Sequence, residues 1–459
     1  MEYCAIVLAA GEGKRMRSKR SKLVHEAAGK PLVRWVADAL AEAGVADQVF
    51  VVGHLQEQVR ATLGDGCAYA VQERQLGTGH AVMQAEGFLE GRSGVVLVLY
   101  GDTPLLRGVT LEGLLARQRE TGAAGVIMTA RAPDPTGYGR VVRGADGLVS
   151  GIVEEKDCTA VQRTIREINA GMYAFDVAAL RSVLGRLEAR NAAGEYYLTD
   201  TIGLLVSDGR PVDAFEAPYA EVGGVNDRVQ LQAASAVLNR RICEAHMRAG
   251  VTVEDPATTW IDASVTIGQD TTVLPGCRLR GATEIGADCV VGPDTRLTDT
   301  VLEDAAEVVA SVVVDSRIGV RAHIGPFTYV RPGSAIGPDC RIGDFVEVKN
   351  STIGHHTNAA HLAYIGDADV GDNVNYGCGS ITVNYDGATK SRTTIGSGAF
   401  IGSNSNLVAP VRVEADAYVA AGSTITADVP AFALAIGRAR QVNKEGWVLK
   451  KGRVRKRKG

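Results

Sequence analysis

The chain has 459 residues, of which 46% are hydrophobic and 22% are charged, and its net charge is −4. That length exceeds one compact core and predicts about two or three domains. The slight net acidity makes nucleic acid an unlikely partner for the chain as a whole.

Three further features bear on the compartment of the protein. No run of about eighteen apolar residues occurs, so we expect no membrane span. The N-terminus is acidic and its apolar run is short, which is not typical of a signal peptide. The eight cysteines are scattered without a Cys-x-x-Cys pair. That pattern favours reduced thiols in the cytoplasm over a disulfide frame or a zinc site.

The first half of the chain alternates apolar runs with helical patterns, which is typical of a doubly wound α/β domain. Residues 5–8, 49–52 and 95–100 are continuous apolar runs, as expected of strands buried on both faces of a parallel sheet. A loop with Gly11 and Gly13 follows the first run, and a helical segment covers 32–43. This arrangement can hold a phosphate on free backbone N–H groups, although a simple tight turn would look the same.

Asp102 directly follows the third strand, at the edge where open α/β sheets bind ligands. A carboxylate there suits Mg²⁺ held against substrate phosphates. The alternative is a turn residue that precedes Pro104. Residues 72–80 are expected to form a polar loop able to read a base edge and a sugar.

The segment Leu8-Ala9-Ala10-Gly11-x-Gly13-x-Arg15-Met16, with Lys22 shortly after it, resembles the signature of sugar-1-phosphate nucleotidylyltransferases. The implied magnesium ligands are Asp102 and Asn226. The implied catalytic cations, which neutralise phosphates, are Arg15 and Lys22. The implied uracil contacts are Gln72, Gly77 and Thr78, and the implied N-acetylglucosamine contacts are Gly139, Glu154 and Asn169. The other implied nucleotide and sugar contacts are Leu8, Ala9, Ala10, Gly11, Tyr100 and Gly101.

Two positions in this half depart from the family pattern. Lys14 stands where Thr is usual and adds a cation beside the phosphates. Ser21 stands where Pro is usual, and we expect it to loosen the approach to Lys22. A solvated surface lysine is the alternative interpretation of Lys22.

A helical stripe connects the two halves of the chain. Leu231, Leu238, Ile242 and Ala245 recur at helical spacing, which predicts a linker helix over 227–250. It would separate a first domain, 1–226, from a second, 251–459. Its solvated face is expected to carry Arg240, Arg241 and Arg248.

Apolar residues in the second half recur at every sixth position, a period of neither helix nor strand. The positions are Ile267, Val273, Leu279, Ile285, Val291, Leu297, Ile318, Ile324, Val330, Ile336, Ile342, Val348, Ile395, Ile401, Leu407, Val413, Val419 and Ile425. A six-residue period is typical of a parallel β-helix in which three hexapeptides make one triangular coil.

The repeat also places polar residues. Arg331 and Lys349 should stack on adjacent coils, where two cations repel unless an anion such as a sugar phosphate lies beside them. Solvated surface charges are the alternative. The period slips after Val348, and 384–392 offers no apolar sixth residue, so this segment should loop out. His355 and His356 are expected at a corner surface.

With the repeat behind the first domain, the whole chain resembles the bacterial bifunctional N-acetylglucosamine-1-phosphate uridylyltransferase / glucosamine-1-phosphate N-acetyltransferase family. The resemblance implies an α/β Rossmann-like nucleotidylyltransferase domain, a linker helix and a left-handed parallel β-helix. It implies acetyl transfer from acetyl-CoA to glucosamine-1-phosphate, then Mg²⁺-dependent uridylyl transfer from UTP. The product would supply peptidoglycan and lipopolysaccharide synthesis in the cytoplasm. A homotrimer with acetyl sites between chains is also implied.

The family resemblance assigns roles within the repeat as well. His361 would be the catalytic base, since a histidine can deprotonate the substrate ammonium near neutral pH. The implied glucosamine-1-phosphate contacts are Arg331, Lys349, Tyr364 and Asn375. The implied acetyl-CoA contacts are Cys378, Asn384, Tyr385, Ser403, Ala421 and Arg438. Ala360 stands where Gly is usual and is expected to tighten the backbone, and the Cys378 thiol is a candidate for alkylation.

Two other functions are compatible with the architecture. A single-function nucleotidylyltransferase with a regulatory β-helix is disfavoured by His361 and by the Arg331 and Lys349 stack. A non-catalytic subunit built on the same folds is disfavoured by Asp102, Asn226 and Lys22. The basic tail, 450–459, is expected to be a disordered, solvated segment, with nucleic-acid or CoA-phosphate contacts as alternatives.

Overall fold

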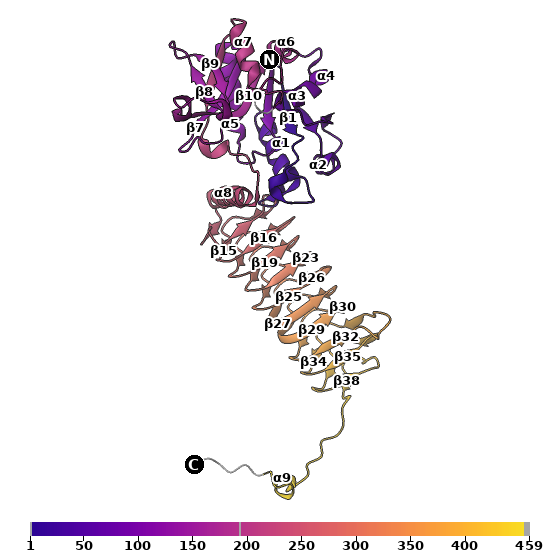
Figure 1. Ribbon diagram of the computed structural model, residues 1–459. Helices are drawn as coiled ribbons and strands as arrows, with labels where there is room; N and C mark the ends of the chain where they lie inside the picture. The colour runs from indigo at the N-terminus through magenta and orange to yellow at the C-terminus, as the bar shows by residue number, and fades with distance from the viewer. Residues whose placement is uncertain (1, 192–193, 454–459) are drawn as a thin grey trace, which may run out of the picture. The chain divides into compact units, whose positions relative to one another are not determined.

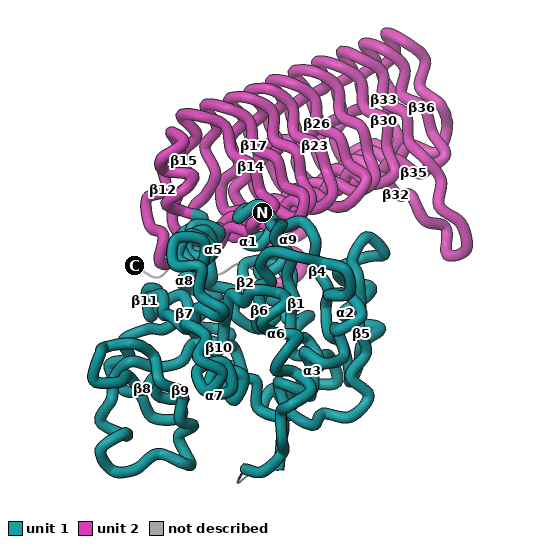
Figure 2. The backbone as a smooth tube through the Cα atoms, turned by 90° about the horizontal axis from the view of Figure 1, so that it is seen from above, with its two compact units in different colours: residues 1–242 teal, residues 243–459 magenta. Residues whose placement is uncertain are grey.

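The computed structural model describes residues 2–191 and 194–453. The chain divides into two compact units, residues 1–242 and 243–459, which are coloured teal and magenta in Figure 2. Figure 1 gives the order of the helices and strands along the chain. In the described ranges no helix is both long and apolar enough to cross a membrane.

The first unit is built on a mixed sheet in which the main strand order is β11–β7–β10–β6–β1–β4–β5. β1 pairs in parallel with β4 and β6, whereas β10 runs antiparallel to β6 and β7. The strands are β1 Tyr3–Ala9, β2 Glu26–Ala27, β3 Lys30–Pro31, β4 Asp47–Val52, β5 Ala68–Val71, β6 Val95–Tyr100, β7 Gly125–Arg131, β8 Arg140–Arg143, β9 Val149–Val153, β10 Glu167–Asp176 and β11 Val212–Glu216. The three strands predicted from apolar runs are β1, β4 and β6.

Helices cover both faces of this sheet. Val7 and Phe50 pack on one face with helices α1 and α5, while Ile6 and Val51 pack on the other with α3, α6 and α7. The helices are α1 Leu32–Glu42, α2 Gln56–Leu63, α3 Thr78–Gln84, α4 Glu86–Leu89, α5 Gly108–Thr121, α6 Val177–Leu184 and α7 Asp200–Ser207. Short 3-10 turns are η1 Lys14–Met16, η2 Lys22–Val24, η3 Glu155–Asp157, η4 Gln162–Thr164 and η5 Tyr219–Glu221. The α/β prediction is confirmed, but the expected loop at 72–80 is shorter because α3 begins at Thr78.

A long helix, α8, occupies Arg228–Arg248, where the amphipathic stripe predicted one. Leu238 is buried and Leu231 packs against the same apolar cluster of the first unit. The expectation that Arg241 is solvated is wrong. Its guanidinium is half-buried and donates to the Leu105 carbonyl at 2.8 Å, and burial lowers its pKa.

The second unit is a parallel β-helix with three walls, so the predicted architecture is confirmed. Each coil gives one short strand to each wall, and the following coil pairs with it in parallel, as Val330 pairs with Val348. The first and second walls share a 19-stranded sheet, and the third wall is a separate nine-stranded sheet. β27 and β29 run without a break from the first wall into the second.

The strands of the second unit are short. They are β12 Thr252–Val253, β13 Trp260–Ile261, β14 Thr266–Ile267, β15 Thr272–Val273, β16 Arg278–Arg280, β17 Glu284–Ile285, β18 Val290–Val291, β19 Arg296–Thr298, β20 Val301–Leu302, β21 Glu307–Val308, β22 Val312–Val314, β23 Ser316–Ile318, β24 His323–Ile324, β25 Tyr329–Val330, β26 Ser334–Ile336, β27 Arg341–Lys349, β28 Thr352–Ile353, β29 Asn358–Gly366, β30 Ala368–Val370, β31 Asn375–Tyr376, β32 Ile381–Val383, β33 Thr393–Ile395, β34 Phe400–Ile401, β35 Asn406–Val408, β36 Val411–Val413, β37 Tyr418–Val419, β38 Thr424–Ile425 and β39 Leu434–Ala435.

The periodic apolar residues fill the interior of the coils. All of them are buried except Ile267, which is half-buried in the first coil of the third wall. The slips of the period are absorbed at corners, since Ile336, Ile353 and Val370 still pair across successive coils. Residues 384–392 leave the coil between β32 and β33, as predicted, and Figure 2 shows a loop standing away from the coils beside β32.

A short helix, α9 Trp447–Lys450, ends at the first residue of the basic tail, 450–459, which was expected to be disordered. The most basic part of the tail, 454–459, lies outside the described residues.

Candidate active sites

The first candidate site is a cavity of about 290 Å³ at the carboxyl ends of β1, β5 and β6. Parallel strands deliver their following loops to one edge, which is why residues far apart in sequence meet here. Ten predicted residues line it: Leu8, Ala9, Ala10, Gly11, Lys22, Gln72, Gly77, Thr78, Tyr100 and Asp102. Gly101 lies behind them, with its N–H donating to the Leu8 carbonyl at 3.0 Å.

Three polar side chains of this site meet at one point. The Lys22 ammonium forms an ion pair with Asp102 and donates to Asn226 Oδ1 at 3.2 Å. The backbone holds this pairing, because the Val225 N–H donates to the Asp102 carbonyl at 2.9 Å. A cation in contact with both oxygens shows that the Asp102 carboxylate and the Asn226 amide converge on one position. Two hard oxygens around one cation position fit a magnesium ion.

The glycine-rich loop sets the position of Lys22. Gly13 has a left-handed backbone with φ +63°, and a Cβ there would lie 2.8 Å from the Lys22 Cβ. The expectation that Ser21 loosens this approach is wrong. Ser21 is buried, and its N–H, which Pro would lack, donates to Gln58 Oε1 at 2.8 Å. Lys14 is exposed and pairs with Glu12 at 2.6 Å.

Arg15 is less closely tied to the cavity. It lies on η1, its side chain is exposed, and it does not line the cavity described above. Its predicted role therefore stays a prediction.

The predicted sugar contacts form a second polar group on the same unit. The Asn169 N–H donates to the Gly139 carbonyl at 2.9 Å, and a Cβ on Gly139 would crowd the Glu154 carboxylate. Burial raises the pKa of Glu154, and the carboxylates of Asp157 and Asp200 raise it further. Glu154 is therefore a carboxyl group poised to accept or share hydrogen bonds with a neutral polyol.

Glu154 is tied to the cavity through Tyr100. Burial raises the pKa of the Tyr100 hydroxyl, and the negative charges of Asp102 and Glu154 add to that effect. Residues not foreseen from the sequence also line the cavity: Leu23, Gln75, Ala81 and Glu195. Gln75 lies in the polar segment already singled out, but nothing in the local sequence marks Glu195.

The second candidate site lies on the β-helix. Arg331 and Lys349 occupy equivalent positions of adjacent coils, as predicted from their spacing. Each of the two cations forms an ion pair with a carboxylate of the same chain. Arg331 pairs with Glu347 at 2.8 Å, and Lys349 pairs with Asp367 at 3.3 Å. The protein itself therefore offsets the repulsion between the two cations, and a bound sugar phosphate is not the only anion that can do so.

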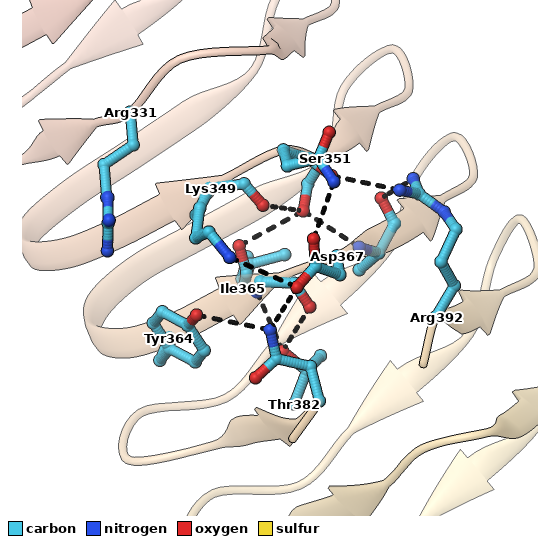
Figure 3. A network of polar contacts seen from close by, with 12 residues as sticks. Arg331, Lys349, Ser351, Tyr364, Ile365, Asp367, Thr382 and Arg392 are labelled. Atoms are coloured by element: carbon cyan, nitrogen blue, oxygen red, sulfur yellow. Dashed lines mark hydrogen bonds and ion pairs between the residues drawn. The ribbon is translucent and has the colours of Figure 1, made fainter. Parts of the chain in front are cut away.

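Asp367 organises the surroundings of Lys349. Its carboxylate accepts hydrogen bonds from Lys349, from Asn350 Nδ2 at 2.6 Å and from Asn384 Nδ2. Burial would raise the pKa of Asp367, but these hydrogen bonds outweigh burial and hold it below its ordinary value. Figure 3 shows Lys349, Tyr364 and Asp367 pointing toward one another. We call the junction of the second and third walls, where Lys349 lies, the Lys349 corner.

The loop at 384–392 adds a cation to the Lys349 corner. The nearby Lys349 ammonium lowers the pKa of Lys390, and Arg331 contributes in the same direction. Three cations therefore face one region, which favours an anionic ligand there. Lys390 was missed because it lies in a loop outside the six-residue register.

His361 lies at a different corner, where β27 and β29 pass from the first wall to the second. We call it the His361 corner. His361 pairs in register with Asp344, and the Nδ1 to Oδ1 distance is 3.0 Å. If Nδ1 carries the proton, it donates to Asp344 and leaves the Nε2 lone pair free to accept a proton. His361 also lowers the pKa of Asp344, which keeps this carboxylate charged.

Most of the predicted acetyl-CoA contacts lie in a column with His361, at the same corner of the following coils. Backbone hydrogen bonds between coils place Cys378, Ser403 and Ala421 at the equivalent position of successive coils. The Arg438 side chain reaches this line, since a Cβ on Gly422 would lie 3.8 Å from Arg438 Cδ. At about 4.8 Å per coil, the column from His361 to Ala421 extends for about 14 Å along the surface. Cys378 is exposed.

The remaining predicted contacts do not join this column. Asn384 lies at the Lys349 corner, where it contacts Asp367 and Tyr364, and Tyr385 follows it into the loop. Asn375 lies on the first wall, in register with Asn358. One chain therefore divides the predicted acetyl-transfer residues between two corners and two walls.

Comparison with known proteins finds a family match in each of the two units. Residues 5–167 match the model of the MobA-like NTP transferase domain, and residues 392–427 match the bacterial transferase hexapeptide model with its six repeats. The curated bifunctional protein GlmU of Acetivibrio thermocellus is 51% identical over 455 residues, which cover 99% of both chains. The GlmU protein of Brevibacillus brevis is 52% identical over 454 residues, or 99% of this chain and 98% of the relative.

The chain belongs to the GlmU family.

Another GlmU protein, from an Exiguobacterium species, is 52% identical over 448 residues, covering 97% of this chain and 99% of its own length. The family match confirms the resemblance stated from the sequence. As a GlmU protein, the chain is a bifunctional transferase with a nucleotidyltransferase domain and a hexapeptide-repeat domain.

Proposed function

We propose that the chain makes UDP-N-acetylglucosamine in two steps. It first transfers an acetyl group from acetyl-CoA to glucosamine-1-phosphate, and it then transfers a uridylyl group from UTP to the N-acetylated product. The observation that carries this proposal is the near-complete match to GlmU proteins in a chain that keeps polar sites in both units. Supply of precursors for peptidoglycan and lipopolysaccharide follows from that product.

In the uridylyl step, a phosphate oxygen of the sugar attacks the α-phosphorus of UTP, and pyrophosphate leaves. Positioning and charge neutralisation carry most of such a reaction because both partners are anions. Asp102 and Asn226 would hold Mg²⁺, which neutralises charge on the phosphates when bound. Lys22 would direct its ammonium to the phosphates beside these two oxygens, and Arg15 is proposed to neutralise the outer phosphates. Gln72, Gly77 and Thr78 would contact the uracil.

In the acetyl step, the amine nitrogen of glucosamine-1-phosphate attacks the thioester carbon of acetyl-CoA. His361 Nε2 takes the proton from the amine, the carbon–sulfur bond breaks, and the CoA thiolate leaves with a proton from the imidazolium. Asp344 holds the imidazole and stabilises its positive charge. The column of Cys378, Ser403 and Ala421 supports binding of the extended CoA chain.

The arrangement of residues favours an assembly of three chains. The cations at the Lys349 corner and the base at the His361 corner lie at opposite edges of the second wall, which is about 10 Å wide for three residues of strand. A neighbouring chain that contributes one edge would complete the acetyl site. An exposed apolar ridge runs beside His361 and would be covered in such an assembly; its members are Phe327, Phe345 and Leu362, and they are 61%, 59% and 57% exposed. The scattered cysteines, without a Cys-x-x-Cys pair, support a cytoplasmic location.

The experiment that tests this proposal assays both reactions on one preparation. UTP consumption with N-acetylglucosamine-1-phosphate is followed with and without EDTA, and CoA release from acetyl-CoA is followed with glucosamine-1-phosphate. We expect EDTA to abolish only the first reaction and His361→Ala to abolish only the second. Failure of either wild-type reaction would remove that half of the proposal, and retention of acetyl transfer by His361→Ala would rule out the base.

A further inference from the structure

A cluster of three side chains lies at the third corner of the β-helix, where the third wall passes into the first. Asp339 lies on one coil, and His355 with His356 lies on the next. One ligand atom from each residue lies within 4.8 Å of the others. This corner is distinct from the Lys349 and His361 corners, and neither proposed reaction uses it.

The geometry of the cluster is close to that of a metal site. His355 Nε2 lies 3.2 Å from Asp339 Oδ2. Two ligands of tetrahedral zinc, each about 2.1 Å from the ion, lie about 3.4 Å apart. This pair is therefore already at the separation that a bound ion requires. His356 is exposed, so a rotation of its imidazole can close the remaining gap.

The surrounding contacts hold the Asp339 carboxylate and the backbone of both histidines in place. Arg321 donates two hydrogen bonds to Asp339, at 2.7 and 2.8 Å, and lowers the pKa of that carboxyl. The backbone N–H of His355 donates to Asp372 Oδ1 at 2.7 Å, and that of His356 donates to the Pro338 carbonyl at 3.0 Å. These contacts fix the aspartate in its charged form and anchor the backbone that carries both imidazoles.

The packing of the two imidazoles also favours a shared ligand. Their ring centroids are 3.9 Å apart with a tilt of 48° between the planes. Rings that lie this close can both present a nitrogen to one ion, and imidazole ligands suit zinc, nickel and copper better than they suit magnesium or calcium.

We propose that Asp339, His355 and His356 form a binding site for a divalent transition metal of the zinc type. Water completes the coordination. The ion joins two successive coils immediately before β29, the strand that carries His361 and Tyr364. Its role is to fix the coil on which the acetyl site is built, and it takes no part in either reaction.

The test measures Zn²⁺ binding to the full-length chain by calorimetry in excess Mg²⁺, which occupies oxygen sites such as Asp102 and Asn226. We expect His355→Gln and His356→Gln each to weaken Zn²⁺ binding at least about tenfold. His323→Gln is the matched control, because His323 pairs with a single carboxylate, Glu307, at 2.8 Å. The control should bind Zn²⁺ as the wild type does.

A second readout separates metal binding from a folding defect. Zn²⁺ should raise the Tm of the wild type and of His323→Gln, and it should not raise the Tm of His356→Gln. The metal-free Tm of each variant shows whether the substitution itself disturbs the fold. Wild-type Zn²⁺ affinity in both His355→Gln and His356→Gln, or no Zn²⁺ binding by the wild type, would overturn the proposal.

Discussion

At the scale of single residues, Gly13 decides how closely the glycine-rich loop approaches Lys22. Its left-handed backbone and the 2.8 Å clearance leave no room for a side chain. A left-handed residue other than glycine costs about 1–3 kcal/mol, and relief of that strain would move the loop away from Lys22.

We therefore expect Gly13→Ala to lower uridylyl transfer about tenfold or more and to leave acetyl transfer unchanged. Steady-state rates of both reactions measure this. Gly66→Ala is the matched control, since a Cβ there meets nothing within 4 Å. Equal uridylyl transfer rates in the two variants would show that Gly13 does not position Lys22.

Asp344 is the residue whose role depends most on a single contact. Its carboxylate lies 3.0 Å from His361 Nδ1 and is the group that fixes which ring nitrogen carries the proton. We predict that Asp344→Asn lowers the kcat of acetyl transfer about tenfold or more, because the imidazolium loses its counter-charge. Steady-state kinetics of acetyl transfer measures this, and an unchanged kcat would contradict the assignment.

At the scale of elements, the loop at 384–392 is held by its own hydrogen bonds. Asp386 Oδ1 accepts from the N–H groups of Ala388 and Thr389, at 2.8 and 2.7 Å, and the Thr389 hydroxyl donates to Oδ2 at 2.8 Å. The Thr389 and Ala388 amides lower the pKa of Asp386 to about 2. The loop presents Asn384 and Lys390 to the Lys349 corner, so its conformation bears on the proposed acetyl site.

A lowered carboxyl pKa stabilises the loop at every pH above the ordinary value, and that stabilisation is lost as pH falls through the folded pKa. We predict that the loop is intact above about pH 4 and loosens toward pH 2. The amide chemical shifts of Ala388 and Thr389, followed by NMR, should titrate with a midpoint of about 2. Asp386→Asn should abolish that titration, and a midpoint near the ordinary aspartate value would refute the prediction.

The β-helix shows how far a sequence pattern reaches. The six-residue period predicted the walls, the inward residues and the stacking of Arg331 on Lys349. It did not predict that Asp344, Glu347 and Asp367 pair with cations or imidazoles one coil away. Those pairs depend on whether a corner holds five or six residues, and on which rotamer a long side chain adopts.

In the first unit, ten of the residues predicted from the sequence line one cavity, because parallel strands end at the same edge of the sheet. Glu195 also lines this cavity, but it lies in a loop that no local sequence pattern marks.

At the scale of the whole molecule, two reactions depend on different levels of organisation. The proposed uridylyl site is built within one unit of one chain. The proposed acetyl site draws on two corners of the β-helix and therefore needs a second copy. The exposed ridge of Phe327, Phe345 and Leu362 is the surface that we expect the copies to share.

A charged side chain in the exposed ridge should abolish acetyl transfer and leave uridylyl transfer intact. Phe345 is 59% exposed and stacks on Phe327 with ring centroids 5.5 Å apart. We predict that Phe345→Asp yields a folded monomer that keeps uridylyl transfer and loses acetyl transfer, because burial of a carboxylate in an apolar interface is costly. Light scattering gives the mass. Leu148→Asp, at an exposed position of the first unit, is the control, and a trimeric Phe345→Asp protein would count against this interface.

Within the described residues, the strands of each coil pair in parallel with those of the coil before it and of the coil after it, so the second unit is held together mainly by nearest-neighbour contacts. Unfolding of such a structure should begin at an open end and advance coil by coil. The free energy needed to unfold the chain around a given residue should then depend on the number of coils between that residue and the end. His361 lies several coils inside the last one, which pairs β39 with β37. Unfolding of the final coils should therefore displace Ala421 and Arg438 first. On heating, CoA binding should weaken before the contact between His361 and Asp344 breaks.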